Sequence, residues 1–156
     1  MDAASLIEIV TGLAPGIVRV EESGMPAVSV ALDGLYDLLR WLRDDHRLRF
    51  DLLLTHTAVD WPERDRFELV YVMYSTEHGH HLIATAEISR SNPVAPTASD
   101  IWPIAHWQER EVYDMFGIQY DGHPDLRRLF LEDDWSGYPL RKDYQDEHML
   151  ERPVWP

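Results

Sequence analysis

The last quarter of the chain constrains its fold most, because this part is rich in aromatic side chains but shows no helical or strand periodicity. Its large apolar residues are Tyr120, Leu126, Leu129, Phe130, Leu131, Trp135, Tyr138, Leu140 and Tyr144. A long run without regular structure is uncommon in a small domain unless it is functional or disordered, and disordered segments are poor in aromatics. The pattern therefore predicts a segment that is held in place by something other than a core of its own.

Composition limits the class of protein. The 156 residues suffice for one domain with a substantial core. The net charge of −14 argues against nucleic-acid binding, which depends on neutralising phosphates. Both parts of the chain are acidic, because residues 1–99 carry 15 acids and 8 bases and residues 100–156 carry 13 acids and 6 bases. Without cysteine, the chain offers no disulfide, thiol nucleophile or cysteine-bound iron–sulfur cluster.

The sequence also bears on location. No apolar stretch approaches the roughly 20 residues of a membrane span. The start, Met1 to Ser5, lacks the basic residues of a secretion signal and the arginines of a transit peptide. We therefore expect a cytosolic chain that reaches a membrane only indirectly.

Hydrophobic periodicity and turn residues predict the order of elements. We expect a helix over residues 3–13 with Asp2 as its N-cap, a β-hairpin of residues 16–21 and 26–32, and a helix capped by Asp33 that ends near Asp45. Strands follow over residues 50–59, 66–75 and 80–88, then a linker over 89–99 and a last helix from near Asp100 to Gly117.

This order, α-β-β-α-β-β-β-α, predicts an α+β fold. We expect a two-layer sandwich with a mostly antiparallel five-stranded sheet, helices on one face, and an extended non-regular C-terminal tail. Residues 1–117 would form the α+β domain, and residues 118–156 would be an extended interface tail of the same domain.

The last helix and the tail suggest an interface. Ile104, Val112, Met115 and Phe116 can form an apolar stripe, with Glu109, Arg110, Tyr113 and Asp114 on the other sides. Aromatic residues and arginine are enriched at protein interfaces. The basic residues of the tail would then meet carboxylates of a partner or bind back to the helix at Glu109, Glu111 and Asp114. These basic residues are Arg127, Arg128, Arg141 and Lys142.

Catalytic chemistry has weaker support. His78 and His80 could both point to one side of a hairpin turn, but no His-Glu-x-x-His pair accompanies them, so a solvated turn is the preferred interpretation. His123 and Asp125 flank a proline, so a turn is the preferred interpretation over an imidazole–carboxylate pair. His56 lies on an apolar strand and is expected to be a core histidine. No nucleophile elbow or nucleotide-binding glycine motif occurs.

The run from Glu109 to Asp143 resembles the signature of the 30-kDa subunit of respiratory complex I, the NADH:quinone oxidoreductase. Its order and spacing over such a length are more specific than a short motif. The similarity covers roughly residues 30–146 and includes upstream segments at Phe50–Asp51, Val59–Pro62, Arg66–Tyr71 and Ser99–Pro103.

The resemblance implies a subunit of the peripheral arm that has no active site of its own. It would pack on the large 49-kDa-type quinone-site subunit and contact other peripheral-arm subunits, on the cytoplasmic side of a bacterial plasma membrane. NADH, FMN, iron–sulfur clusters and a quinone would bind to other subunits. The expected partner-facing residues are Glu109, Arg110, Glu111, Tyr113, Asp114, His123, Asp125, Arg127, Arg128, Trp135, Tyr138, Arg141, Lys142 and Asp143.

Three alternatives stay open at this point. Membrane-bound hydrogenases and ferredoxin- or F420-linked complexes use similar subunits, and the sequence has no feature that separates them. A stand-alone metal-dependent enzyme would use His78, His80 and acidic residues. A free-standing interaction module would have a partner outside respiration, and an isolated chain could also associate with itself.

Overall fold

The computed structural model describes residues 2–20 and 24–146. Its centre is a five-stranded sheet with the strand order β1-β2-β5-β4-β3. These strands are β1 (Val18–Arg19), β2 (Ala27–Ser29), β3 (Leu52–Trp61), β4 (Arg66–Tyr74) and β5 (His81–Ser89). The predicted α+β class and five-stranded sheet are confirmed. The predicted hairpin is β1 and β2, and its turn at residues 21–23 lies outside the described residues.

The sheet is mixed rather than uniformly antiparallel. The pairs β1–β2, β3–β4 and β4–β5 are antiparallel, whereas β2 and β5 run parallel. This parallel pair joins strands that lie more than 50 residues apart, with Ala27 opposite Ile83. A connection of this kind requires a crossover, and α2 lies within it.

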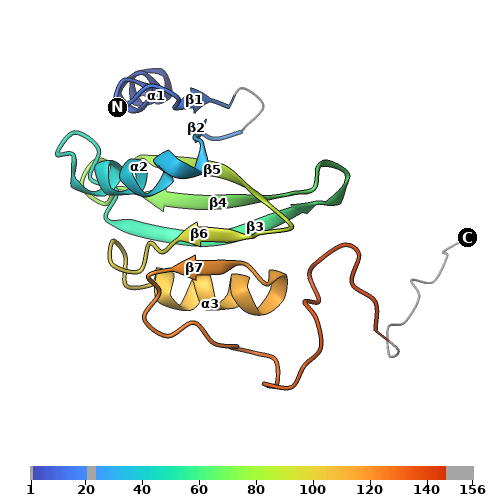
Figure 1. The fold of residues 1–156 in the computed structure, drawn as a ribbon. Coiled ribbons are helices and arrows are strands. Elements are labelled where there is room, and N and C mark those ends of the chain that lie inside the picture. The colour runs from blue at the N-terminus through green and yellow to red at the C-terminus, as the bar shows by residue number, and fades with distance from the viewer. Residues whose placement is uncertain (1, 21–23, 147–156) are drawn as a thin grey trace, which may run out of the picture.

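In the described part of the chain three α-helices accompany the sheet, and Figure 1 shows α1 and α3 at opposite ends of it. They are α1 (Ala3–Thr11), α2 (Leu32–Asp44) and α3 (Ala105–Phe116), and a short 3-10 turn, η1 (Pro62–Arg64), connects β3 to β4. Asp2 caps α1 as predicted, since its Oδ1 accepts the N–H of Ser5. Asp33 does not cap α2, because that helix already begins at Leu32 after Ala31. That all helices share one face of the sheet stays a prediction.

Two short strands lie outside the predicted order. Strand β6 (Val94–Pro96) lies within the expected linker and pairs in parallel with β7 (Gln119–Asp121), at the start of the expected tail. Pro93 and Pro96 made residues 89–99 look like a linker, but a short edge strand tolerates proline. The tail is therefore not wholly non-regular. Helix α3 lies between β6 and β7, and it begins at Ala105 rather than near Asp100.

Strand alternation places the main core on one face of the sheet. In β4, Phe67, Leu69, Tyr71 and Met73 are buried, and the residues between them are half-buried. Leucines of α2 join the same core. The ring of Phe67 lies 6.1 Å from that of Phe116, so the core continues from the sheet into α3. This contact fixes the helix that carries the candidate site.

Candidate functional site

Helix α3 turns the predicted Val112, Met115 and Phe116 toward the core, but Ile104 and the charged residues do not lie as predicted. Glu109 and Asp114 are fully buried and Arg110 nearly so, whereas Ile104 is 47% exposed and Trp107 is 52% exposed. The prediction that Ile104 lines an inward stripe and that these three charged residues project elsewhere is therefore wrong. Burial of charged groups requires partners inside the protein, and the following segment of the chain supplies them.

We call residues 122–146 the C-terminal strap, because this segment runs along α3 without forming a helix or strand of its own. Its central anchor is Asp114. Oδ1 of Asp114 accepts a hydrogen bond from Nη1 of Arg128 at 2.9 Å. Oδ2 accepts three consecutive backbone N–H groups, from Leu129, Phe130 and Leu131, at 2.7 to 3.1 Å. One carboxylate therefore fixes four residues of the strap.

The charge of Asp114 is well compensated. Burial by itself raises the pKa of this carboxyl, but the Arg128 guanidinium and the three backbone N–H groups lower it more, so the pKa falls below its usual value. Arg128 in turn donates Nη2 to the carbonyls of Trp135 and Gly137. The strap is thus bent around the Arg128 side chain, and Arg128 binds back to the helix rather than remaining free for a partner.

Arg110 secures the beginning of the same segment. Its Nε donates to the carbonyl of Arg127 at 3.2 Å and its Nη2 to the carbonyl of Arg128 at 2.9 Å. The guanidinium carbon also lies 5.1 Å from the ring centroid of Trp107, a cation–π distance. Arg110 therefore connects the strap with the exposed face of α3.

Glu109 holds the segment that precedes α3. Its Oε1 accepts the N–H of Ala98 at 2.6 Å, and its Oε2 hydrogen-bonds with the Thr97 hydroxyl. Burial raises the pKa of Glu109 to about 7, with a further small increase from Asp100, although both hydrogen bonds oppose the shift. Nε2 of His123 in the strap lies 3.9 Å from Oε2, and it also contacts the carbonyl of His106.

Beside Glu109 lies a buried aromatic group. Tyr71 stacks on His56 with ring centroids 4.0 Å apart, and Nε2 of His56 hydrogen-bonds with the Tyr120 hydroxyl at 2.5 Å. Burial lowers the pKa of His56 to about 4, so this histidine is neutral at physiological pH. His56 is therefore a satisfied core histidine, as predicted from its strand.

The far end of the strap is pinned to the sheet. Asp60 at the end of β3 accepts Nε of Arg90 and the backbone N–H of Lys142, both at 2.8 Å. Arg90 also bonds Asp143 at 2.8 Å. Arg141 donates its Nε to the carbonyl of Phe116 at 2.7 Å. Sequence analysis did not identify Asp60 and Arg90, since they lie more than 50 residues before their strap partners.

Gly117 allows the strap to pass close to the end of α3. It caps the helix at φ 75°, a left-handed conformation that favours glycine. A Cβ atom at this position would lie 2.5 Å from the ring of Tyr138. The glycine predicted as a helix stop therefore also makes room for the strap.

The predicted partner-facing residues fall into two groups. One group points inward or binds within the chain: Glu109, Arg110, Asp114, His123, Arg128, Tyr138 and Arg141. The other group is exposed or, for Tyr113, half-exposed, although Asp125 and Arg127 pair with each other and Asp143 pairs with Arg90: Glu111, Tyr113, Asp125, Arg127, Trp135, Lys142 and Asp143. Phe130 and Leu140 are also exposed on the strap. The strap thus has an inner side of satisfied charges and an outer side with aromatic and apolar residues.

The histidines proposed for a metal have other contacts. Nε2 of His78 contacts the carbonyl of His46, and Nε2 of His80 contacts that of Leu48. Within residues 2–20 and 24–146, no three His, Asp or Glu side chains converge in a way that could hold a metal ion. The same residues include no helix long and apolar enough to cross a membrane.

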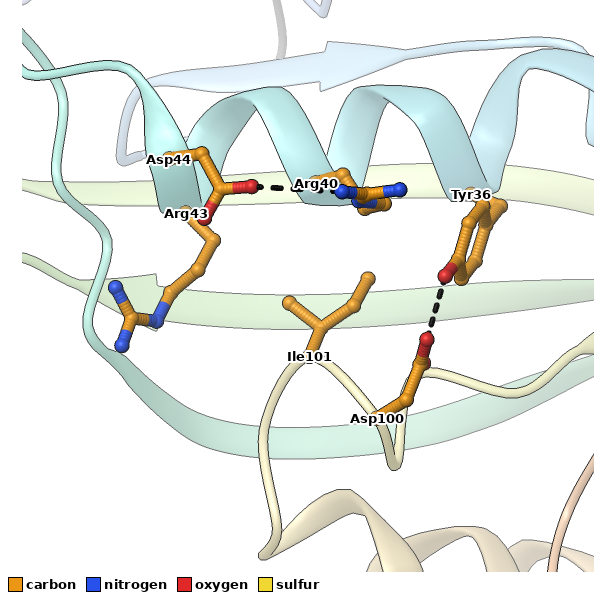
Figure 2. Close-up of a pocket in the computed structure, with 6 residues that line it drawn as sticks. All are labelled: Tyr36, Arg40, Arg43, Asp44, Asp100 and Ile101. Carbon is orange, nitrogen blue, oxygen red and sulfur yellow. Dashed lines mark hydrogen bonds and ion pairs between the residues drawn. The ribbon is translucent and has the colours of Figure 1, made fainter.

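A hollow of about 410 Å³ lies between α2 and the turn before α3, and Figure 2 shows the residues that line it. It is lined by Tyr36, Arg40, Arg43, Asp44, Asp100 and Ile101. The Tyr36 hydroxyl donates to Asp100, and Arg40 lies 3.9 Å from Asp44. Two cations and two anions balance each other here, so the hollow favours neither an anion nor a cation.

The model of the family described as "Respiratory-chain NADH dehydrogenase, 30 Kd subunit" matches residues 28–149. The chain belongs to this family. The predicted resemblance is thereby confirmed. Among relatives, the NADH-quinone oxidoreductase C subunit of Rhodobacter capsulatus is 43% identical over 129 residues, which are 82% of this chain and 64% of the relative. The chain spans 40% to 71% of the length of three relatives of this kind.

Two solved structures share the fold. A chain in the membrane-bound sulfane sulfur reductase, an archaeal respiratory membrane complex, aligns with a TM-score of 0.80 and 28% identity, covering 98% of this chain and 95% of that one. The trypsin-resistant fragment (1–134) of Nqo5 aligns with a TM-score of 0.68 and 26% identity, covering 81% of this chain and the whole fragment.

Proposed function

We propose that this chain is a non-catalytic scaffold subunit in the peripheral arm of a proton-translocating NADH:quinone oxidoreductase, and that it packs on the large 49-kDa-type quinone-site subunit. Membership of the 30-kDa family supports the assembly. The observation that carries the scaffold role is the strap, whose polar inner side is satisfied by α3 while Phe130, Trp135 and Leu140 face outward.

In this proposal the strap is the contact surface and the sheet is its support. The sheet positions α3, α3 fixes the strap, and the exposed aromatics of residues 122–146 meet the partner. Aromatic anchors on a preordered segment lose little conformational entropy on binding. Rigid presentation of this kind is what a permanent scaffold needs.

The redox chemistry would belong to the assembly. NADH, FMN, iron–sulfur clusters and the quinone would bind to other subunits, in agreement with a chain that has no cysteine to ligate a cluster. The subunit would lie on the cytoplasmic side of a bacterial plasma membrane and would contact the membrane only through the complex.

A second candidate is the equivalent subunit of a related respiratory complex. The observation that favours it is the alignment with a chain of the archaeal sulfane sulfur reductase complex. In that case the scaffold role is unchanged, and a hydrogenase or a ferredoxin- or F420-linked reaction replaces NADH oxidation.

A pull-down tests both candidates. The tagged chain is recovered from gently solubilised native membranes, and every co-purifying protein is identified by mass spectrometry. Recovery of the large quinone-site subunit together with NADH- and flavin-binding subunits supports complex I. Recovery with hydrogenase- or ferredoxin-linked subunits supports the second candidate. Recovery of the tagged chain alone, or only as a self-associated species, contradicts both.

A further inference from the structure

The exposed side of α3 contains an unexplained arrangement of residues. Ile104, Trp107 and Glu111 are all exposed and lie at positions i, i+3 and i+7, so they line one side of the helix. We call these residues the outer face of α3. A helix at a protein surface ordinarily exposes its charges, but α3 buries Glu109, Arg110 and Asp114 in addition to the apolar residues that face the core, and leaves Ile104 and Trp107 exposed.

Single exposed apolar residues are common on soluble proteins and need no explanation. The outer face of α3 differs from such single residues because two large apolar side chains are exposed on a helix whose charged residues Glu109, Arg110 and Asp114 are buried. Exposing Trp107 in this way forgoes the favourable burial of one of the largest apolar side chains. An exposed tryptophan on a rigid helix is the kind of residue that dominates binding energy at interfaces.

The charge beside Trp107 indicates the chemistry of the occupant. Among the described residues, no hydrogen bond or ion pair engages the exposed carboxylate of Glu111. The chain as a whole carries a net charge of −14. A basic side chain on the other molecule would therefore be complementary to this position.

The outer face of α3 is also continuous with the strap. Trp107 lies against Arg110, and Arg110 binds the carbonyls of Arg127 and Arg128. On the other side, Nε2 of Gln108 donates to the carbonyl of Leu54, whose side chain is exposed at the edge of the sheet. A molecule on the strap can thus extend over α3 to β3 without leaving the surface.

We propose that the outer face of α3 is a second docking surface, on which Trp107 enters an apolar pocket of a partner subunit beside an arginine or lysine that pairs with Glu111. The proposal rests on the proposed function, since its occupant is a polypeptide of the same assembly. It adds anchor residues that the strap does not contain. Trp107 is the principal anchor, Ile104 extends the apolar contact, and Glu111 sets the orientation.

Site-specific photocrosslinking tests the identity of the occupant. A photoreactive p-benzoylphenylalanine replaces Trp107 in the tagged chain, which is expressed in its native host and irradiated in membranes. The matched control carries the same group in place of Trp41, a 39% exposed tryptophan on α2. A covalent product with another subunit from position 107, but not from position 41, supports the proposal. A product with a second copy, a link within the chain itself, or no product overturns it.

Substitutions provide a second measurement. Trp107→Ala and Glu111→Arg are expected to reduce co-purification of the partner about thirtyfold and at least severalfold, respectively, while Trp41→Ala leaves it unchanged. Both variants keep a folded domain, which circular dichroism verifies, because neither side chain is buried. Full co-purification of both variants overturns this inference and leaves the proposed function intact. If the unaltered chain recovers no partner, the proposed function itself fails.

Discussion

The sheet and the C-terminal strap are stabilised in different ways. Between β4 and β5, stability comes from buried aliphatic and aromatic side chains on one face, such as Leu69 and Leu82. Along α3, the strap is held mainly by carboxylates and guanidiniums whose partners are backbone groups of the strap. The apolar face of the sheet tolerates repacking among similar side chains. The polar contacts between α3 and the strap are more sensitive, because removing one charged group breaks several hydrogen bonds at once.

The largest expected effect is that of Asp114→Ala. Removal of this carboxylate leaves three backbone N–H groups without their acceptor and deprives Arg128 of its counter-charge, and breaking a buried charge pair costs about 3–5 kcal/mol. Urea unfolding monitored by circular dichroism measures the loss, and limited trypsin digestion should show faster cleavage after Arg127 and Arg128.

Asp125→Ala is the matched control for this experiment. Asp125 also pairs with an arginine of the strap, Arg127, but both side chains are largely exposed. Exposed pairs contribute little to stability, so this variant should unfold like the unaltered protein. If Asp114→Ala also leaves the free energy of unfolding unchanged, the strap is held by its apolar contacts, and the sheet and the strap are not stabilised in different ways.

The second effect concerns pH. Burial raises the pKa of Glu109 from 4.5 to about 7 in the folded protein. The contribution of this carboxyl group to the free energy of unfolding is therefore fully present below about pH 4.5. This contribution is lost as pH rises through 7, in total on the order of 3 kcal/mol. Glu109→Gln keeps an acceptor for the N–H of Ala98 and presents an amide N–H group to the Thr97 hydroxyl in place of the acceptor Oε2, and it should remove this loss.

The measurement is the difference in unfolding free energy between the two proteins from pH 4.5 to 8. Burial lowers the folded-state pKa values of His56, His80 and His123, which give the opposite slope as they protonate at low pH. The effects of His56 and His80 cancel in the difference because both residues are present in both proteins, whereas His123 lies 3.9 Å from Glu109 and is replaced by glutamine in both proteins for this comparison. A difference that stays constant over this range would show that Glu109 is already ionised in the fold.

The smallest effect compares two glycines. Gly117→Ala and Gly79→Ala both place a side chain at positive φ, 75° and 67°, but only position 117 brings Cβ against another ring, that of Tyr138. Thermal unfolding should show the 117 variant to be less stable by about a further 1–3 kcal/mol, the usual cost of overpacking. Equal losses would mean that Tyr138 moves aside freely and that the strap is loosely held at this point.

Local sequence pattern predicted the long strands and α2, but it did not predict the polar contacts between α3 and the C-terminal strap. The alternation in β4 and the leucine spacing in α2 follow from a single buried face, and sequence periodicity detects such a face directly. The parallel pairing of β2 with β5 and the short strands β6 and β7 depend on contacts between distant segments, which periodicity does not contain.

The burial of charged residues on α3 could not be predicted from the helix alone for the same reason, although its core-facing Val112, Met115 and Phe116 could. The usual expectation that charged residues face solvent fails where a later segment supplies their partners. Asp114 is buried because residues 128–131 bring one guanidinium and three N–H groups to it. One signal was available in the sequence: Trp107 follows Ile104 by three residues, so an outward pair on one side of the helix was a possible alternative.

The three consecutive N–H groups on Asp114 also have a consequence for the order of events during synthesis. Asp114 emerges from the ribosome before residues 129–131, and domains generally begin to fold from the N-terminal side. The sheet and α3 can therefore form first, and the strap takes its shape on a surface that already exists. The contact surface for a partner is then completed last, so a chain whose sheet has not folded presents no finished strap to be bound.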